Sequence, residues 1–242
     1  MKRLFRTSQT LLAVLASVGG LANYAFSQST SDPHRPACTT AICRKVKSFA
    51  RARYCGASPF GNGPDDGCEL KKIIKPQAGV DVIADYECKW NESKQNAECE
   101  QHGEPSRDIR SILIQQLARL GTPANAPGQT YFTVWKSAHS GWSLAAAYYS
   151  RPADSDVEIC EVIGVIDQRS RMITLRKVPF QKTDQDVPTV VEWVPLDLAD
   201  ANGDGTEDII LEGDAYEDHW LEVVSVEGWS AETIFSGLGY YL

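Results

Sequence analysis

The chain has 242 residues, with 24 Lys and Arg against 32 Asp and Glu, and a formal net charge of −8 at pH 7. This acidic balance argues against a nucleic-acid-binding protein, which needs a basic surface. The length allows one domain, or two small ones, with a substantial hydrophobic core.

The N-terminus is typical of a secretory signal peptide. The basic pair Lys2 and Arg3 precedes a short apolar core at residues 11–18 and a small-x-small cleavage pattern at residues 25–27. We therefore expect residues 1–27 to be removed and the mature protein to be secreted or periplasmic. The apolar core is shorter than a membrane span of about 20 residues, and an uncleaved anchor is the alternative. No later segment is apolar enough to cross a bilayer.

Seven cysteines follow, and six of them lie within residues 38–99. In an exported chain such a cluster predicts a disulfide framework. Spacing does not decide the pairing, and we expect neighbours in the sequence to pair, as Cys38–Cys43, Cys55–Cys68 and Cys88–Cys99. Closing the Gly- and Pro-rich loop of the middle pair would contribute about 3 kcal/mol. A zinc site is the weaker alternative for Cys88, Cys99 and His102, because no paired C-x-x-C motifs frame them.

Two helices are predicted in this first half. Apolar residues recur at helical spacing in residues 40–54. The other face of this segment is basic and carries Arg44, Lys45, Lys47, Arg51 and Arg53. We expect that face to be solvated, with docking onto an anionic polymer or onto the acidic half of the chain as the alternatives. The second helix has a continuous apolar stripe, and Ser106 and Gly121 fit its start and its end. Between the helices, residues 80–88 predict a strand and residues 88–99 a hairpin.

Beyond residue 129 the pattern changes to short strands with frequent aromatic residues. The expected strands are residues 131–136, 142–149, 157–166, 172–178, 189–194, 208–211, 220–226 and 233–235. Their spacing favours a sandwich or a curled antiparallel sheet. We expect most of the aromatic side chains in the core, with a ligand platform as the alternative. Cys160 is the unpaired cysteine, and we expect a buried thiol rather than a nucleophile or an intermolecular bridge.

These elements predict an α+β protein with a disulfide-rich N-terminal part that contains two helices and a mainly antiparallel β C-terminal part. The expected division is a signal peptide at residues 1–27, the Cys-rich region at 28–128 and the β domain at 129–242. Charge is split between the last two parts. Residues 28–128 carry a net +2 and residues 129–242 a net −13, and no basic residue follows Lys182. Such an acidic patch favours a bound divalent cation.

The segment D-A-N-G-D-G-T-E-D at residues 200–208 is the most informative in the chain. Oxygen-bearing side chains occupy its positions 1, 3, 5 and 9, which are Asp200, Asn202, Asp204 and Asp208. Gly205 at position 6 allows a sharp turn, and the carbonyl of Thr206 offers one more oxygen. Because Ca²⁺ prefers roughly six to eight oxygen ligands, the pattern predicts a calcium site. An acidic turn rich in Asp and Asn is the alternative.

The apolar run after this loop predicts a strand rather than the helix of an EF-hand. An EF-hand also needs a bidentate Glu at position 12, where this chain has Leu211. Residues 196–213 resemble the calcium loop of FG-GAP/VCBS repeats, the modules of integrin-α β-propellers. The resemblance implies a role in adhesion or ligand binding, and it implies Ca²⁺ ligands at Asp200, Asn202, Asp204, Thr206 (main chain) and Asp208. The loop occurs once and the chain is too short for seven blades, so the resemblance covers the loop and not a propeller.

The best enzymatic candidate is the acidic segment that follows. Glu212 and Asp214 fall on one face of the expected strand, and together with Glu217, Asp218 and His219 they offer an acid–base group or further metal ligands. A solvated acidic turn is the alternative. Nucleophile-elbow, zinc-protease and phosphate-loop motifs are absent from the sequence. We therefore expect an exported, non-catalytic calcium-binding module with a protein or glycan partner. The alternative is a small exported hydrolase that uses residues 212–219.

Overall fold

The structure is a computed structural model that describes residues 38–55, 79–91, 96–123, 128–137, 139–153, 156–184, 191–215 and 218–241. The predicted signal peptide, Cys68 and Glu217 lie outside these ranges. The described residues form two helices and ten strands: α1 (Ala41–Tyr54), β1 (Val80–Asn91), β2 (Asn96–Gly103), α2 (Arg107–Arg119), β3 (Gln129–Ser137), β4 (Trp142–Ala153), β5 (Asp156–Asp167), β6 (Met172–Asp184), β7 (Glu192–Ala199), β8 (Asp208–Ala215), β9 (Asp218–Glu227) and β10 (Ser230–Tyr241).

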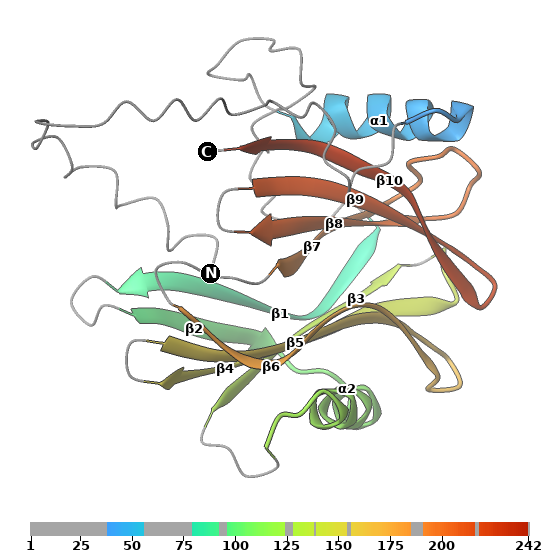
Figure 1. Cartoon of the computed structure of the whole chain (residues 1–242). Helices are drawn as coiled ribbons and strands as arrows, with labels where there is room; N and C mark the ends of the chain where they lie inside the picture. The colour runs from blue at the N-terminus through green and yellow to red at the C-terminus, as the bar shows by residue number, and fades with distance from the viewer. Residues whose placement is uncertain are drawn as a thin grey trace, which may run out of the picture.

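The elements stack in four layers, with two sheets in the middle and one helix on each outer side (Figure 1). One sheet has six strands in the order β2-β1-β3-β4-β5-β6, and the other has four in the order β10-β9-β8-β7. The strand pairs in both sheets are antiparallel. The predicted α+β class is therefore confirmed. β1 and β2, which belong to the Cys-rich region, complete the same sheet as β3 to β6.

The core between the sheets follows from the period of two along each strand, which sends alternate side chains to opposite faces. On β3, Trp135 points to the facing sheet while its neighbour Val134 points to α2. On β5, Ile163 and Val162 divide in the same way. The six-stranded sheet is thus covered on both faces, which is why the β5 sequence is an almost unbroken apolar run.

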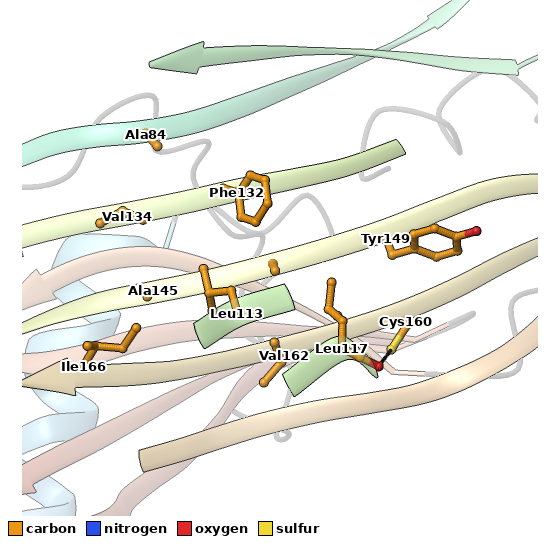
Figure 2. Packing of buried hydrophobic residues seen from close by; sticks show 11 residues of the cluster. Ala84, Leu113, Leu117, Phe132, Val134, Ala145, Tyr149, Cys160, Val162 and Ile166 are labelled. Carbon is orange, nitrogen blue, oxygen red and sulfur yellow. Dashed lines mark hydrogen bonds between the residues drawn. The ribbon is translucent and has the colours of Figure 1, made fainter. Parts of the chain in front are cut away.

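Helix α2 packs on the outer face of the six-stranded sheet. Ser106 caps its first turn, where Oγ accepts a hydrogen bond from Ile109 N at 3.3 Å. The helix ends before Gly121, whose φ of +104° suits glycine, as the sequence predicts. Leu113 and Leu117 fill the contact with the sheet, as Figure 2 shows.

Helix α1 covers the outer face of the four-stranded sheet. Its first turn is capped by Thr40, whose Oγ1 accepts a hydrogen bond from Cys43 N at 3.0 Å. Val46, Ala50 and Tyr54 are fully buried against a patch made of β8, β9, β10 and the β7–β8 loop. The apolar face predicted for residues 40–54 is therefore covered by the four-stranded sheet.

Two of the predicted disulfides are confirmed, Cys38–Cys43 and Cys88–Cys99. The second joins residues that face each other directly in the β1–β2 hairpin. Its formation uses both cysteines of the alternative zinc site. Cys55 is also disulfide-bonded, while its predicted partner lies outside the described residues. Cys160 is free and buried, as predicted.

The strand predicted at residues 189–194 lies further along the chain, because β7 runs from Glu192 to Ala199. Proline lacks a backbone N–H and is tolerated in sheets at edge strands and bulges. Pro195 occupies both kinds of position, since β7 is an edge strand and its pairing with β8 is irregular between Pro195 and Asp197. None of the described helices is long and apolar enough to span a membrane.

Candidate functional site

The predicted calcium loop connects β7 to β8. These strands are neighbours, and Ala199 pairs with Asp208, so the two ends of the loop meet at the same edge of the sheet. Gly203 and Gly205 turn the chain between them with φ of +76° and +90°, a backbone region that residues with a Cβ rarely adopt. The expected glycine turn at position 6 is present.

Three of the predicted ligand side chains meet in this loop. The amide Nδ2 of Asn202 donates to Asp204 Oδ2 at 2.9 Å and lies 3.4 Å from Asp208 Oδ1. The Asn202 amide oxygen accepts from Asp204 N at 2.8 Å. Positions 3, 5 and 9 therefore face a common space, in which the amide group of Asn202 lies between two carboxylates.

Asp200 and Thr206 take part through the loop backbone. Asp200 accepts hydrogen bonds from Gly203 N, Asp204 N and Gly205 N at 2.5 to 3.0 Å. Thr206 N donates to Asp204 Oδ1 at 2.7 Å. Within the described ranges, no three or more His, Cys, Asp or Glu side chains form a group that could hold a metal ion. The loop thus gathers the predicted donors while its own N–H groups bind several of their oxygens.

The surroundings of Asp208 and Asp204 shift the pKa values of these two loop carboxylates in opposite directions. Asp208 is fully buried, and burial raises its pKa to about 6 despite hydrogen bonds from Ser225 and from the N–H groups of Asn202 and Ala201. Asp204 is exposed. The hydrogen bond from Thr206 N lowers the pKa of Asp204, and the nearby charge of Lys45 lowers it further. A cation at the loop would relieve the cost of ionising Asp208.

The loop also contacts the layer on each side of it. A Cβ on Gly203 would overlap the ammonium of Lys45 on α1. On the other side, Glu207 Oε1 accepts a hydrogen bond from Ser137 Oγ at 2.5 Å and lies 3.1 Å from His139 Nδ1. Both partners of Glu207 belong to the six-stranded sheet or to the turn after β3. The loop is therefore a junction between α1 and the two sheets.

A hollow of about 240 Å³ lies beside this junction and is lined by Gly79, Val80, His139, Leu198, Ala199, Asp200, Gly205 and Glu207. Sequence reasoning missed Glu207, because position 8 of the loop is not a ligand position. The only hint of Glu207 in the sequence is that an acidic residue stands in a turn directly before a buried strand.

The acidic segment after the loop also converges, because β8 and β9 pair with Asp214 opposite His219. His219 Nδ1 lies 3.1 Å from Asp214 Oδ1 and 3.6 Å from Glu212 Oε1. The three side chains are largely buried, with 19%, 19% and 10% of their surface exposed in the order His219, Asp214 and Glu212. The structure therefore brings the three enzymatic candidates together. The side chain of Asp218 lies outside the described part.

A further buried carboxylate, Glu161 on β5, was not among the predicted site residues. Its Oε2 accepts a hydrogen bond from Trp193 N at 3.0 Å. Burial raises the pKa of Glu161 well above its ordinary value, and the negative charge of Glu192 adds to the effect. Next to it, Tyr148 belongs to a stack with Tyr86. The hint of Glu161 in the sequence is that an acidic residue occupies a core-facing position of the apolar strand β5.

Comparisons of the chain with protein-family models, curated protein sequences and solved structures returned no match. They add nothing to the resemblance between residues 196–213 and FG-GAP/VCBS loops.

Proposed function

We propose that this protein is a calcium-binding module that works outside the cytoplasm, with the ion held by the β7–β8 loop. The proposal rests on the meeting of Asn202, Asp204 and Asp208 at one place in the loop. Carboxylate, amide and main-chain oxygens are the donors that Ca²⁺ prefers. Asp200 and the carbonyl of Thr206 complete the proposed set.

The charge distribution supports a cation at this place. The last sixty residues contain no Lys or Arg, so the acidic groups of this segment depend on cations from elsewhere. Because Asp208 is buried, ionising it without a partner is unfavourable. Binding of Ca²⁺ would require the half-buried Asn202 amide to flip about its terminal bond so that its oxygen replaces its nitrogen, with loss of the hydrogen bonds that the nitrogen donates to Asp204 and Asp208. The ion would then hold the β7–β8 connection in one conformation.

The disulfides support a location in an oxidising compartment, where such bonds form and persist. Calcium is abundant outside cells, and modules that work there bind it with dissociation constants of about 10⁻⁴ to 10⁻³ M. We propose that the signal peptide directs export and that the module binds a protein or glycan partner without catalysis. Because α1 and α2 cover part of the outer face of each sheet, we propose that loops and sheet edges of the described residues contribute the surface for such a partner.

Calorimetric titration of the purified mature protein with CaCl₂ tests the site. We expect binding of one ion by the wild type, together with a rise in its melting temperature. Asp204→Ala should abolish both effects. Glu232→Ala, which removes an exposed carboxylate from β10, should leave both unchanged. Wild-type calcium affinity in the Asp204→Ala variant would contradict the assignment.

The convergence of Glu212, Asp214 and His219 favours one alternative, a small exported hydrolase. In that case the carboxylates and the imidazole would form an acid–base group. A panel of glycoside substrates compared between the wild type and Glu212→Gln, with Glu232→Gln as a surface control, provides the test. Activity that falls at least about a hundredfold with Glu212→Gln alone would favour the enzyme, and equal activity would exclude Glu212 as the acid.

A further inference from the structure

Lys45 lies against the tip of the proposed calcium loop. It comes from α1, more than 150 positions earlier in the sequence, and its ammonium occupies the space next to Gly203 that a Cβ would fill. A Cβ on Gly203 would also lie 3.1 Å from Lys45 Cε. The missing side chain at position 4 of the loop therefore makes room for a lysine from another layer.

The helix holds Lys45 in this place through its own packing. Val46, the next residue, is fully buried in the cluster that α1 forms with the four-stranded sheet. Two turns later, Arg53 binds Asp197 of β7 at 2.8 Å, three residues before the loop begins. The packing thus fixes where the Lys45 side chain leaves the helix, next to the loop, while the side chain itself is exposed.

We propose that Lys45 is a built-in competitor of the calcium ion, a cation that partly neutralises the loop when calcium is absent and weakens calcium binding when it is present. This inference rests on the proposed calcium site. It also gives the basic face of α1 a role, since at least one of its cations lies on the acidic half of the chain.

The physical basis is repulsion between like charges at the same cluster of oxygens. The positive charge of Lys45 stabilises the ionised form of Asp204. A divalent cation bound beside Asp204 would repel the Lys45 ammonium. Because coupling between two ligands is reciprocal, calcium must weaken the contact between Lys45 and the loop by the same factor by which Lys45 weakens calcium binding. Calcium binding would therefore weaken the electrostatic attraction between Lys45 and the β7–β8 loop.

Two matched variants of the full-length mature protein separate this role from a general charge effect. Lys45→Gln removes the ammonium at the loop. Arg44→Gln removes the charge of an exposed neighbour on the same helix. Arg44 Nη1 donates to the Thr39 carbonyl at 2.9 Å and not to the loop. Each variant is titrated with CaCl₂ by calorimetry at low salt and at about 1 M NaCl, where the Debye length shrinks to about 3 Å. Melting temperatures are measured in EGTA.

At low salt we expect Lys45→Gln to bind calcium about fivefold more tightly than the wild type, and Arg44→Gln to change the affinity less than about twofold. The gain should shrink at high salt. Without calcium, Lys45→Gln should melt about 1–3 °C lower, because Asp204 loses its counter-charge. This pair of opposite effects is not expected from a lysine that only covers the surface.

The outcomes distinguish the two proposals. Equal calcium affinity of the wild type and Lys45→Gln, with binding retained in both, would overturn the role of Lys45 and leave the calcium site intact. Equal gains in Lys45→Gln and Arg44→Gln would also overturn it. Absence of calcium binding in the wild type and in both variants would instead overturn the calcium site itself.

Discussion

Arg53 and Asp197 form an ion pair that joins the first described helix to strand β7. Arg53 Nη2 and Nε lie 2.8 and 3.0 Å from Asp197 Oδ2, and Tyr54 OH donates to the same oxygen at 3.1 Å. Asp197 is fully buried. Removal of one partner from a buried pair leaves the other charge without compensation.

We therefore expect Arg53→Met to lower the free energy of unfolding by about 2 kcal/mol, measured by urea denaturation. Adding Asp197→Asn to that variant should recover part of the loss, because the uncompensated charge is then removed. Arg44→Met is the control for loss of a basic residue from the helix surface. Similar losses in Arg53→Met and Arg44→Met would show that the pair contributes no specific stability.

Calcium binding should weaken in acid if Asp208 is a ligand. The folded protein without calcium holds the Asp208 proton with a pKa of about 6, so a proton competes with the ion below that pH. We expect the calcium dissociation constant to be about tenfold higher at pH 5 than at pH 7. Titrations at pH 5.5 in two buffers with different ionisation enthalpies should also detect proton release. Equal affinity at the two pH values would exclude Asp208 as the competing group.

Glu161 predicts a second, independent pH effect. Burial raises its pKa in the folded protein well above the unfolded value, so the folded state binds this proton more tightly. The contribution of Glu161 to stability is therefore fully present below about pH 4.3 and is lost as the pH rises through the folded pKa. Glu161→Gln removes this loss. In urea denaturation, the free energy of unfolding of the variant should therefore rise relative to that of the wild type as the pH increases from 4.5 to 8. A difference that stays constant across that range would contradict the prediction.

The elements themselves could be predicted because their signals are local. Ser106 and Gly121 frame α2 as capping rules require, and the β1–β2 hairpin follows the spacing of Cys88 and Cys99. The stacking of the layers is not local. Nothing near residues 80–103 indicates that β1 pairs with β3 across an intervening helix, because that pairing depends on contacts far apart in the sequence.

In the candidate site, too, local features could be predicted from the sequence and long-range contacts could not. The oxygen donors at Asp200 to Asp208 form a spaced motif that the sequence alone displays, whereas only the folded chain places Lys45 beside Gly203 and Glu207 beside Ser137. The strand β7 was misplaced because Pro195 and Asp197 are ordinarily turn residues. An edge position accommodates the proline, and Arg53 from a distant helix accommodates the buried acid.

Thiol chemistry can check the cysteine framework. Cys160 is free and buried, and the other cysteines of the described residues are in disulfides. We expect slow reaction of the native protein with a thiol reagent and release of one thiol per chain after unfolding without reductant. Peptide mapping of the oxidised protein should recover Cys55 linked to Cys68. More than one free thiol, or a different partner for Cys55, would contradict the predicted pairing.

The packing of α1 on β10 has a consequence for how the chain matures. The first described helix buries Val46, Ala50 and Tyr54 against a surface that includes Phe235 near the end of the chain. These contacts cannot form until the last strands have been synthesised, and contacts between such distant segments slow folding. Helix α1 therefore lacks its apolar cover until β10 has been synthesised, which makes the closing of this outer layer a late event in the folding of the described elements.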